Sequence, residues 1–233
     1  MAREPVRGLF ITGTDTNVGK TYVGALIARN LREQGHRVGV YKPVASGCRR
    51  EGDKLVCDDA LALWNAAGMP GELKYVCPQI FEAPLAPHLA ADAEGKRIDR
   101  SLLRSGLDNW LANSDVVLVE GAGGLLSPIG DEVVADLALD FGFPLVIVAR
   151  NALGAINQVL QTEHTAATYR SGLQVAGIVL NEASRESNDA SSASNRREIA
   201  KRSKAPMLCE VRHGADHLTA ELNWFNLATA QRK

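Results

Sequence analysis

Short runs of consecutive apolar residues alternate along this chain with longer segments in which apolar residues recur every three or four positions. The consecutive runs predict strands buried on both faces, at 8–11, 38–41, 116–119, 145–149, 175–180 and 207–210. The longer segments predict helices, at 22–34, 101–113, 131–141, 153–169 and 196–203. A further helix is expected to begin at 58–64, and a weak one at 218–230. This alternation predicts a parallel sheet with helices on both faces.

Four segments interrupt the alternation. Residues 49–54 are charged and are expected to form an exposed loop, whereas 73–76 could form a strand. The prolines of 82–88 predict a loop, and the Ser, Asn and Ala residues of 187–195 predict a mobile one. No internal repeat is visible. Because 233 residues with 45% hydrophobic content can form one sizeable core, we expect one α/β domain over 1–233.

The loop between the first predicted strand and the first predicted helix indicates a phosphate site. Residues 13–21 read Gly-Thr-Asp-Thr-Asn-Val-Gly-Lys-Thr. Backbone N–H groups of such a loop and the positive end of the next helix can hold a nucleotide phosphate. Lys20 can reach the β- and γ-phosphates, and the Thr21 hydroxyl can bind magnesium. The common spacing would place the first glycine where this chain has Thr14, but the glycine is Gly13. A chance turn is the alternative, which the flanking strand and helix disfavour.

Two charged residues stand directly after predicted strands. Lys42 follows 38–41 and precedes Pro43, which cannot continue a central ladder. Glu120 follows 116–119 and precedes a glycine-rich turn. Open parallel sheets bind ligands beyond the carboxyl ends of their strands, so both side chains are expected beside the phosphate loop. We favour a functional Lys42 over a solvated surface lysine. We favour magnesium binding for Glu120, because a buried carboxylate without a partner is costly.

Three other candidate positions are weaker from the residues alone. Asp58 and Asp59 open the helix at 58–64, where acidic side chains favour a helix N-terminus, so capping is the better interpretation. His88 is expected to be structural. Gly154 opens the helix at 153–169, whose free N–H groups could bind an anion, with an ordinary helix start as the alternative.

Charge and cysteine usage exclude several classes of protein. The formal net charge of −1 and the lack of long basic runs argue against nucleic acid or an anionic membrane as the main partner. The four cysteines form no C-x-x-C pair, so we expect reduced thiols and neither a disulfide framework nor a zinc site. Residues 1–5 carry no apolar signal region, and no apolar stretch approaches the length of a membrane span. We therefore expect a soluble, cytoplasmic protein.

Several segments together resemble the dethiobiotin synthetase family. The matching segments are 12–21, 41–47, 59–63, 87–88, 117–124 and 153–157. The resemblance extends over 8–182, and a phosphate loop with its first glycine at 13 is the form that this family shows. The chain departs from the family pattern at Asn17, where many relatives have glutamate, and at 211–213.

The resemblance implies a P-loop NTPase-like α/β fold and an ATP-dependent ligase of biotin biosynthesis. Such an enzyme makes dethiobiotin from 7,8-diaminopelargonate and CO2. Carbon dioxide adds to one amine as a carbamate, which takes the γ-phosphoryl group of ATP as a mixed anhydride. The second amine then closes the ring and releases phosphate. The family also implies Mg2+, ATP as co-substrate, and a homodimer with its active site at the subunit interface.

The resemblance assigns roles to the matching positions. Lys20, Lys42 and Thr21 are implied in catalysis, where the two lysines would neutralise charge on the carbamate and the transferred phosphoryl group. Thr21, Asp59 and Glu120 are implied to hold magnesium. Nucleotide contacts are implied for Gly13, Thr16, Asn17, Val18, Gly19, Lys20, Thr21, Tyr22, Asp59, Glu120, Gly121, Ala122, Gly123 and Asn181, the last facing the adenine. Substrate contacts are implied for Thr14, Ser46 and, from the second subunit, Gly154, Ala155, Ile156 and Asn157.

Three other functions are compatible with a related fold. Partitioning ATPases carry a signature lysine four residues before the second loop glycine, where this chain has Asp15. Amidoligases of cobalamin synthesis usually bear a glutaminase domain, for which 233 residues leave no room. A non-catalytic nucleotide-binding module would not need Lys42 and Glu120 together with Lys20. We therefore favour the function implied by the resemblance to the dethiobiotin synthetase family over these three alternatives.

Overall fold

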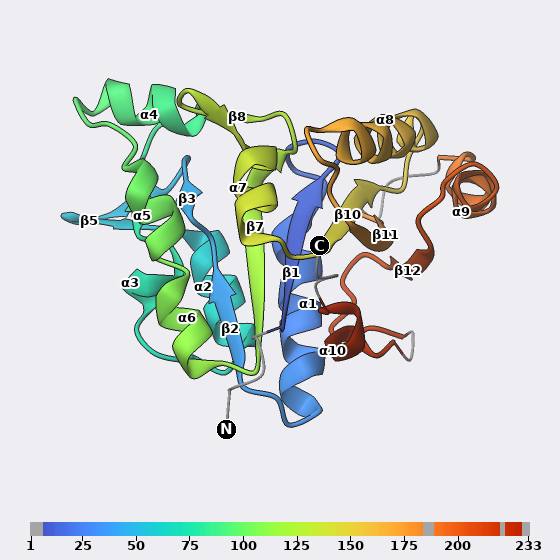
Figure 1. Ribbon diagram of the computed structural model, residues 1–233, viewed down its shortest axis with the longest axis horizontal. Helices are drawn as coiled ribbons and strands as arrows, with labels where there is room; N and C mark the ends of the chain where they lie inside the picture. The colour runs from blue at the N-terminus through green and yellow to red at the C-terminus, as the bar shows by residue number, and fades with distance from the viewer. Residues whose placement is uncertain (1–6, 184–188, 220–221, 230–233) are drawn as a thin grey trace.

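A six-stranded sheet forms the centre of the protein. The computed structural model describes residues 7–183, 189–219 and 222–229 (Figure 1). The strand order is β12-β11-β10-β1-β7-β2, and every neighbouring pair is parallel. The strands are β1 (Arg7–Gly13), β2 (Val38–Tyr41), β7 (Val116–Gly124), β10 (Leu145–Arg150), β11 (Val175–Asn181) and β12 (Met207–Val211). The parallel α/β fold predicted from the apolar runs is confirmed.

Helices cover both faces of this sheet. Because crossovers between parallel strands are right-handed, connections that run in opposite directions along the sheet place their helices on opposite faces. Accordingly, α1 (Lys20–Glu33) links β1 to β2 and packs on β1, β2, β7 and α2 (Asp58–Ala66). The opposite connections carry α7 (Val134–Phe141), which packs on β7, and α8 (Ala155–Thr168), which packs on β10 and β11. In Figure 1, α7 lies in front of β7 and α1 lies behind β1.

Two segments between β2 and β7 differ from the sequence prediction. Residues 73–76 form a helical turn, α3 (Leu73–Val76), and not a strand. The helix predicted over 101–113 is divided into α5 (Arg100–Ser105) and α6 (Asp108–Asn113). The Tyr41 hydroxyl lies 3.0 Å from the carbonyl oxygens of both Leu102 and Leu103 at this break. A hydroxyl that hydrogen bonds with helix carbonyls competes with the helix ladder, which accounts for the interruption.

One short antiparallel hairpin replaces an expected loop, and another replaces the start of an expected helix. Residues 49–54 fall in a hairpin of β4 (Arg49–Glu51) and β5 (Lys54–Val56). The helix predicted over 131–141 starts later, since β8 (Pro128–Ile129) and β9 (Glu132–Val133) form a hairpin before α7. A further small pair, parallel in this case, joins β3 (Val44–Ala45) to β6 (Gln79–Ile80).

The remaining differences concern helix boundaries. The loop predicted over 82–88 ends early, because α4 (Pro87–Ala93) begins with Pro87 in its first turn, a position that suits proline. α9 (Ser192–Ala200) begins inside the segment predicted as a mobile loop, of which 187–188 lie outside the described residues. Within the weak helix predicted over 218–230, the described residues form α10 (Trp224–Leu227), and 220–221 and 230 lie outside the described residues. Within the described part of the chain, no helix is long and apolar enough to cross a membrane.

Candidate active site

The carboxyl ends of the strands surround a cavity of about 1200 Å³. It collects most of the site residues predicted from the sequence, and these lining residues are Thr16, Asn17, Gly19, Lys20, Thr21, Tyr22, Lys42, Ser46, Asp59, Glu120, Ala122, Gly123 and Asn181. Among the predicted residues of the phosphate loop and the glycine-rich turn, four do not line it in the described structure, namely Gly13, Thr14, Val18 and Gly121. These four belong to the phosphate loop and the glycine-rich turn that form its walls.

The phosphate loop owes its shape to its two glycines. Gly19 precedes α1 with φ of +92°, a left-handed conformation that glycine adopts without strain. A Cβ atom at Gly13 would lie 2.6 Å from the carbonyl oxygen of Asp15 and 3.1 Å from Lys20 Nζ. Glycine at position 13, one residue earlier than the common spacing, is therefore the residue that lets the loop fold back on itself. Asn17 also has positive φ, of +57°.

Lys20 lies along this loop with little exposure to solvent. Its Nζ donates a hydrogen bond to the carbonyl oxygen of Asp15 at 3.1 Å, and 8% of the residue is exposed. Burial lowers the pKa of Lys20 below its ordinary value, although the nearby carboxylate of Glu120 opposes the shift. A desolvated ammonium beside a phosphate loop is suited to pair with phosphate oxygens.

Asn181, at the end of β11, is packed directly against the phosphate loop. Its Nδ2 donates to the carbonyl oxygen of Val18 at 2.9 Å, and a Cβ at Gly19 would lie only 2.0 Å from that nitrogen. The Oδ1 atom is buried and has no hydrogen-bond partner among the residues that the structure describes. Oδ1 is therefore free to accept a hydrogen bond from a group entering the cavity.

Lys42 and two carboxylates form the charged centre of the cavity. Lys42 Nζ lies 2.6 Å from Asp59 Oδ2 and 2.5 Å from Glu120 Oε1, and Thr21 Oγ1 donates to the same Glu120 oxygen at 2.9 Å. The Lys42 and Glu120 side chains are buried, whereas the Asp59 side chain is 49% exposed. Asp59 is thus more than a helix cap, because its carboxylate faces Lys42. Glu120 lies inside β7, which continues five residues beyond the predicted strand end at 119.

The pKa values of this cluster follow from burial and from mutual charge. Burial alone would lower the pKa of Lys42, but Glu120 and Asp59 raise it above its ordinary value, so the ammonium stays charged. Burial raises the pKa of Glu120, and the Lys42 ammonium limits the rise. Burial also acts against ionisation of Asp59, but Lys42 lowers the pKa of that carboxyl overall. The cluster therefore holds a fixed positive charge between two carboxylates.

The donor atoms beside the phosphate loop fit a magnesium ion that is bound together with a nucleotide. Glu120 Oε2 is buried without a hydrogen-bond partner in the described structure, and the Thr21 hydroxyl and Asp59 carboxylate lie beside it. Oxygen ligands of this kind suit Mg2+, which keeps several waters and binds through one or two carboxylates plus substrate phosphates. Among the described residues, no group of three or more His, Cys, Asp or Glu is arranged to hold a metal alone. Phosphate oxygens would therefore be needed to complete such a site.

The glycine-rich turn after Glu120 packs backbone to backbone against the phosphate loop. Gly124 pairs with Gly13, and a Cβ at Gly124 would lie 3.1 Å from the Gly13 carbonyl oxygen. The backbone N–H of Gly124 donates to Ser127 Oγ at 2.9 Å. A Cβ at Gly121 would lie 2.7 Å from Val134 of α7. The glycines therefore allow close approach, and Gly121 takes no direct part in the cavity lining.

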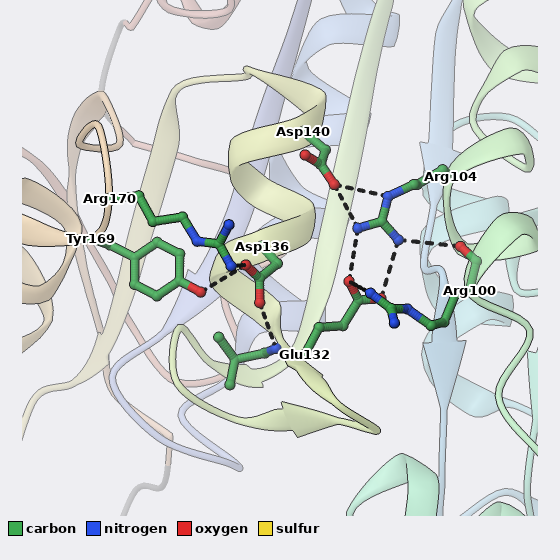
Figure 2. Close-up of polar contacts among 8 residues, drawn as sticks. Arg100, Arg104, Glu132, Asp136, Asp140, Tyr169 and Arg170 are labelled. Atoms are coloured by element: carbon green, nitrogen blue, oxygen red, sulfur yellow. Dashed lines mark hydrogen bonds and ion pairs between the residues drawn. The ribbon is translucent and has the colours of Figure 1, made fainter.

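An ion-pair network behind this turn holds β9 and α7 in place. Figure 2 shows Arg104 between Glu132 and Asp140, at 2.8 and 2.5 Å, with Arg100 also beside Glu132. Asp136, in the first turn of α7, accepts hydrogen bonds from the Val133 backbone N–H and the Tyr169 hydroxyl, and it pairs with Arg170 (Figure 2).

No pattern in the sequence indicates these partners, because they come from elements far apart in the chain. Arg104 lies on α5 and Glu132 on β9, while Tyr169 and Arg170 follow α8. The network fixes the hairpin of β8 and β9, whose Pro128 lines the cavity.

Other lining residues were also missed from the sequence. They come from the proline-rich loop and from the ends of β7, β11 and β12, and they include Pro84, Leu85, Ala86, Pro87, Ser127, Glu182, Ala183, His213 and Gly214. The Tyr22 hydroxyl donates to the carbonyl oxygen of Ala215 and so holds the segment after β12 over α1. Ser46 Oγ donates to the Leu85 carbonyl oxygen at 2.6 Å, which places Ser46 beneath the proline-rich loop. Thr14 Oγ1 is buried without a partner among the described residues.

The N-terminus of α8 lies apart from this cavity. Gly154 precedes α8 with φ of +94°, and Leu153 is 85% exposed. In the described structure the cavity lining includes none of Gly154, Ala155, Ile156 and Asn157. These four residues therefore do not join the other predicted site residues within one chain.

Known proteins resemble this chain over most of its length. Residues 7–219 match the family described as AAA domain. An ATP-dependent dethiobiotin synthetase of Rhodopirellula baltica is 42% identical over 215 residues, which cover 87% of this chain and 83% of that protein. The dethiobiotin synthetase of Anoxybacillus flavithermus is 35% identical over 94% of this chain and 97% of its own. This chain belongs to the dethiobiotin synthetase family. The resemblance inferred from the motifs is thereby confirmed, together with membership of a family of ATP-dependent ligases.

Solved structures support the same fold. A ParA family ATPase of Chlorobium tepidum has a TM-score of 0.56 at 17% identity and covers 90% of this chain and 86% of its own. The signal recognition particle receptor FtsY of Elizabethkingia anophelis has a TM-score of 0.53 at 18% identity, and this chain spans 65% of its length. At such identities the likeness concerns the P-loop NTPase fold alone, which agrees with the fold class predicted for this dethiobiotin synthetase family member.

Proposed function

We propose that this protein converts 7,8-diaminopelargonate, CO2 and ATP into dethiobiotin, ADP and phosphate, as a step of biotin biosynthesis. The observation that carries the proposal is the cluster of Lys42, Asp59, Glu120 and Thr21 at the edge of the phosphate loop, within one cavity. A phosphate loop alone would support nucleotide binding. A buried cation fixed beside it supports transfer of the phosphoryl group to an acceptor in the same cavity.

The proposed reaction has three steps. One amine of the substrate attacks CO2 and loses a proton to give a carbamate. A carbamate oxygen attacks the γ-phosphorus of ATP, the bond to the bridging oxygen breaks, and ADP leaves. The second amine attacks the carbonyl carbon of the mixed anhydride, loses its proton, and expels phosphate as the ureido ring closes.

The chain's own residues meet the charge demands of these steps. Lys20 and the loop N–H groups would bind the β- and γ-phosphates. Lys42 would lie between the carbamate and the transferred phosphoryl group, where negative charge accumulates. Its ammonium is held by Glu120 and Asp59 before substrate arrives, so little reorganisation is needed during transfer.

Magnesium is the metal we propose for this site. Thr21, Asp59 and Glu120 would hold it together with nucleotide phosphates, and the ion would neutralise phosphate charge. Asn181, whose buried Oδ1 is available to a ligand, would accept a hydrogen bond from the adenine amino group.

The distal carboxylate of the substrate requires a second subunit in this proposal. Ser46, which lines the cavity, would contact the substrate near the carbamate, and Thr14 would be a further substrate contact, whereas the helix start at 154–157 is outside the cavity of its own chain. The positive end of a helix suits a carboxylate. We therefore propose a homodimer in which each α8 N-terminus completes the partner's site. Four buried free thiols and the demand for ATP support a cytoplasmic location.

The test is incubation of the purified protein with 7,8-diaminopelargonate, bicarbonate, magnesium and ATP, followed by mass spectrometry. Formation of dethiobiotin with one ADP per product is the expected result. The matched control is Lys42→Met, which removes the ammonium but keeps a long side chain. Absence of dethiobiotin with every nucleoside triphosphate tried would refute the proposal.

A further inference from the structure

Three of the four cysteines lie together on the outer side of the active site. Cys48, Cys57 and Cys77 are buried, with 5%, 8% and 6% of their surfaces exposed. Cys48 precedes β4, Cys57 follows β5, and Cys77 ends α3. The fourth cysteine, Cys209, lies away from them in β12. The proposed reaction uses none of these thiols.

The β4–β5 hairpin brings Cys48 and Cys57 face to face. Its antiparallel register pairs Arg49 with Val56 and Glu51 with Lys54, so the next pair of opposed positions is Cys48 and Cys57. Opposed residues of an antiparallel pair have Cα atoms about 4.5–5.5 Å apart. A disulfide needs about 4.4–6.8 Å between Cα atoms, which this arrangement meets. Each of the two thiols perturbs the pKa of the other, which agrees with this close placement.

Cys57 also connects this pair to the active site. Its Sγ accepts a hydrogen bond from the backbone N–H of Ala60 at 3.4 Å and so caps the N-terminus of α2. Asp59 stands in the same first turn, and its carboxylate lies 2.6 Å from Lys42 Nζ. A change at the Cys57 sulfur therefore acts on the turn that positions a carboxylate of the site.

We propose that Cys48 and Cys57 form a reversible oxidation site that lowers activity when it becomes a disulfide. The oxidant is a two-electron oxidant of peroxide type. One thiolate attacks the peroxide oxygen and becomes a sulfenic acid with release of water. The other thiol then displaces the hydroxyl as a second water, so two thiols and one hydrogen peroxide give one disulfide and two waters.

The consequence for the site follows from the lost cap. In the disulfide, Cys57 Sγ turns toward Cys48 and gives up the Ala60 N–H. The first turn of α2 then loses its side-chain cap, and Asp59 is held less firmly against Lys42. This effect on activity rests on the proposed function, whereas formation of the disulfide does not.

Cys77 is the competing partner of Cys57. The thiols of these two residues also perturb each other's pKa, and Cys77 Sγ donates a hydrogen bond to the carbonyl oxygen of Gln79 at 3.6 Å. The hairpin register favours Cys48, because it fixes opposed backbone positions, whereas Cys77 comes from a separate helical turn. A shared metal is not supported, since no group of three such ligands in the described chain is arranged to hold one.

Non-reducing peptide mapping tests the pairing. The full-length protein is treated with hydrogen peroxide, the remaining thiols are alkylated, and the protein is digested with trypsin. Cleavage after Arg37, Arg49 and Lys54 separates the two cysteines into peptides 38–49 and 55–74, while Cys77 falls in 75–96. A disulfide between 38–49 and 55–74, removed by dithiothreitol, is expected. Alkylation of both cysteines after peroxide, or linkage of 55–74 to 75–96, would overturn the proposal.

Two serine variants provide matched controls, and activity is a separate readout. Cys77→Ser should keep the linked peptide, and Cys48→Ser should lose it. Peroxide should lower the rate of dethiobiotin formation by about fivefold or more in the unaltered protein, comparable with loss of a helix cap. Dithiothreitol should restore the rate, and Cys48→Ser should be insensitive. An unchanged rate in fully oxidised protein would overturn the regulatory effect. If the reduced protein makes no dethiobiotin, the proposed function fails while the peptide map still decides the disulfide.

Discussion

Lys42 and Glu120 stand opposite each other at the same level of two neighbouring parallel strands. The register pairs Tyr41 of β2 with Val119 of β7. Lys42 and Glu120 are the next residues after this pair, and Lys42 Nζ lies 2.5 Å from Glu120 Oε1. Both side chains are buried, with 6% and 1% of their surfaces exposed. A buried ion pair contributes little net stability, but removal of one partner leaves an uncompensated charge. The contribution of this pair to stability can therefore be measured separately from its contribution to catalysis.

Three variants distinguish the two contributions: Lys42→Met, Glu120→Gln and the double variant. Lys42→Met should lower the free energy of unfolding by about 3–5 kcal/mol, because Glu120 is left buried without its cation. The double variant should recover most of this stability in urea unfolding, since it leaves no buried charge without a partner. Its kcat should remain about 100-fold or more below that of the unaltered protein, because the cation beside the phosphoryl group is still missing. Recovery of kcat together with stability would limit Lys42 to a structural role.

Gly19→Ala, compared with Gly35→Ala, tests the contact between the phosphate loop and Asn181. Both glycines have positive φ, of +92° and +89°. Alanine should cost about 1–2 kcal/mol of stability at either position through backbone strain. A Cβ at Gly19 would lie 2.0 Å from Asn181 Nδ2, whereas nothing in the described structure lies within 4 Å of one at Gly35.

Only Gly19→Ala should therefore weaken ATP binding, by about tenfold or more in titration calorimetry. Equal losses of affinity in both variants would show that strain alone matters and that the Asn181 contact does not.

Asp136→Asn should alter the acid stability of the protein. Burial opposes ionisation of Asp136, but the Val133 N–H, the Tyr169 hydroxyl and Arg170 lower the pKa of this carboxyl overall. The stability that these contacts give is present above the ordinary carboxyl pKa of about 4 and is lost as pH falls through the lower folded value.

The variant should lose about 1–3 kcal/mol at neutral pH, and its difference from the unaltered protein should narrow below about pH 4. Tyr169→Phe is the control, since it removes one hydrogen bond, costs about 1 kcal/mol and keeps the carboxylate. Urea unfolding at several pH values measures both variants. A difference that stays constant down to the lowest pH would contradict the assignment.

Mixed dimers test whether two subunits share each site. Lys20→Ala disables the phosphate loop, and Gly154→Glu places a carboxylate where the proposed substrate carboxylate binds. Each variant alone should be inactive. In an equal mixture half of the dimers are mixed, and each of these has one intact site, so about a quarter of the full activity should return. No recovery after subunit exchange would indicate that each chain builds its own site.

The strands were predictable because each buried strand is a nearly unbroken apolar run, and such runs have few alternative structures. The phosphate loop, Lys42 and Glu120 were predictable because strand ends in a parallel sheet converge on one edge. Asp59 was different, because the residues alone favoured a helix cap at this position. Only the structure, in which its carboxylate lies opposite Lys42, makes it part of the site. The helical turn at 73–76 was missed because four residues show no period.

The ion pairs around Glu132 could not be predicted either, because their partners meet only after α5, β9 and α7 pack together. Likewise, the hairpin at 49–54 is built of charged residues, which carry no apolar alternation to mark its strands.

The hydrogen bond from Asn181 to the Val18 carbonyl joins residues 163 positions apart in the chain. Contacts this distant form late, because the intervening loop must close first. During synthesis on the ribosome, the phosphate loop therefore emerges before the strand that carries Asn181. The loop gains this hydrogen bond only after β11 has been made and has paired with the sheet.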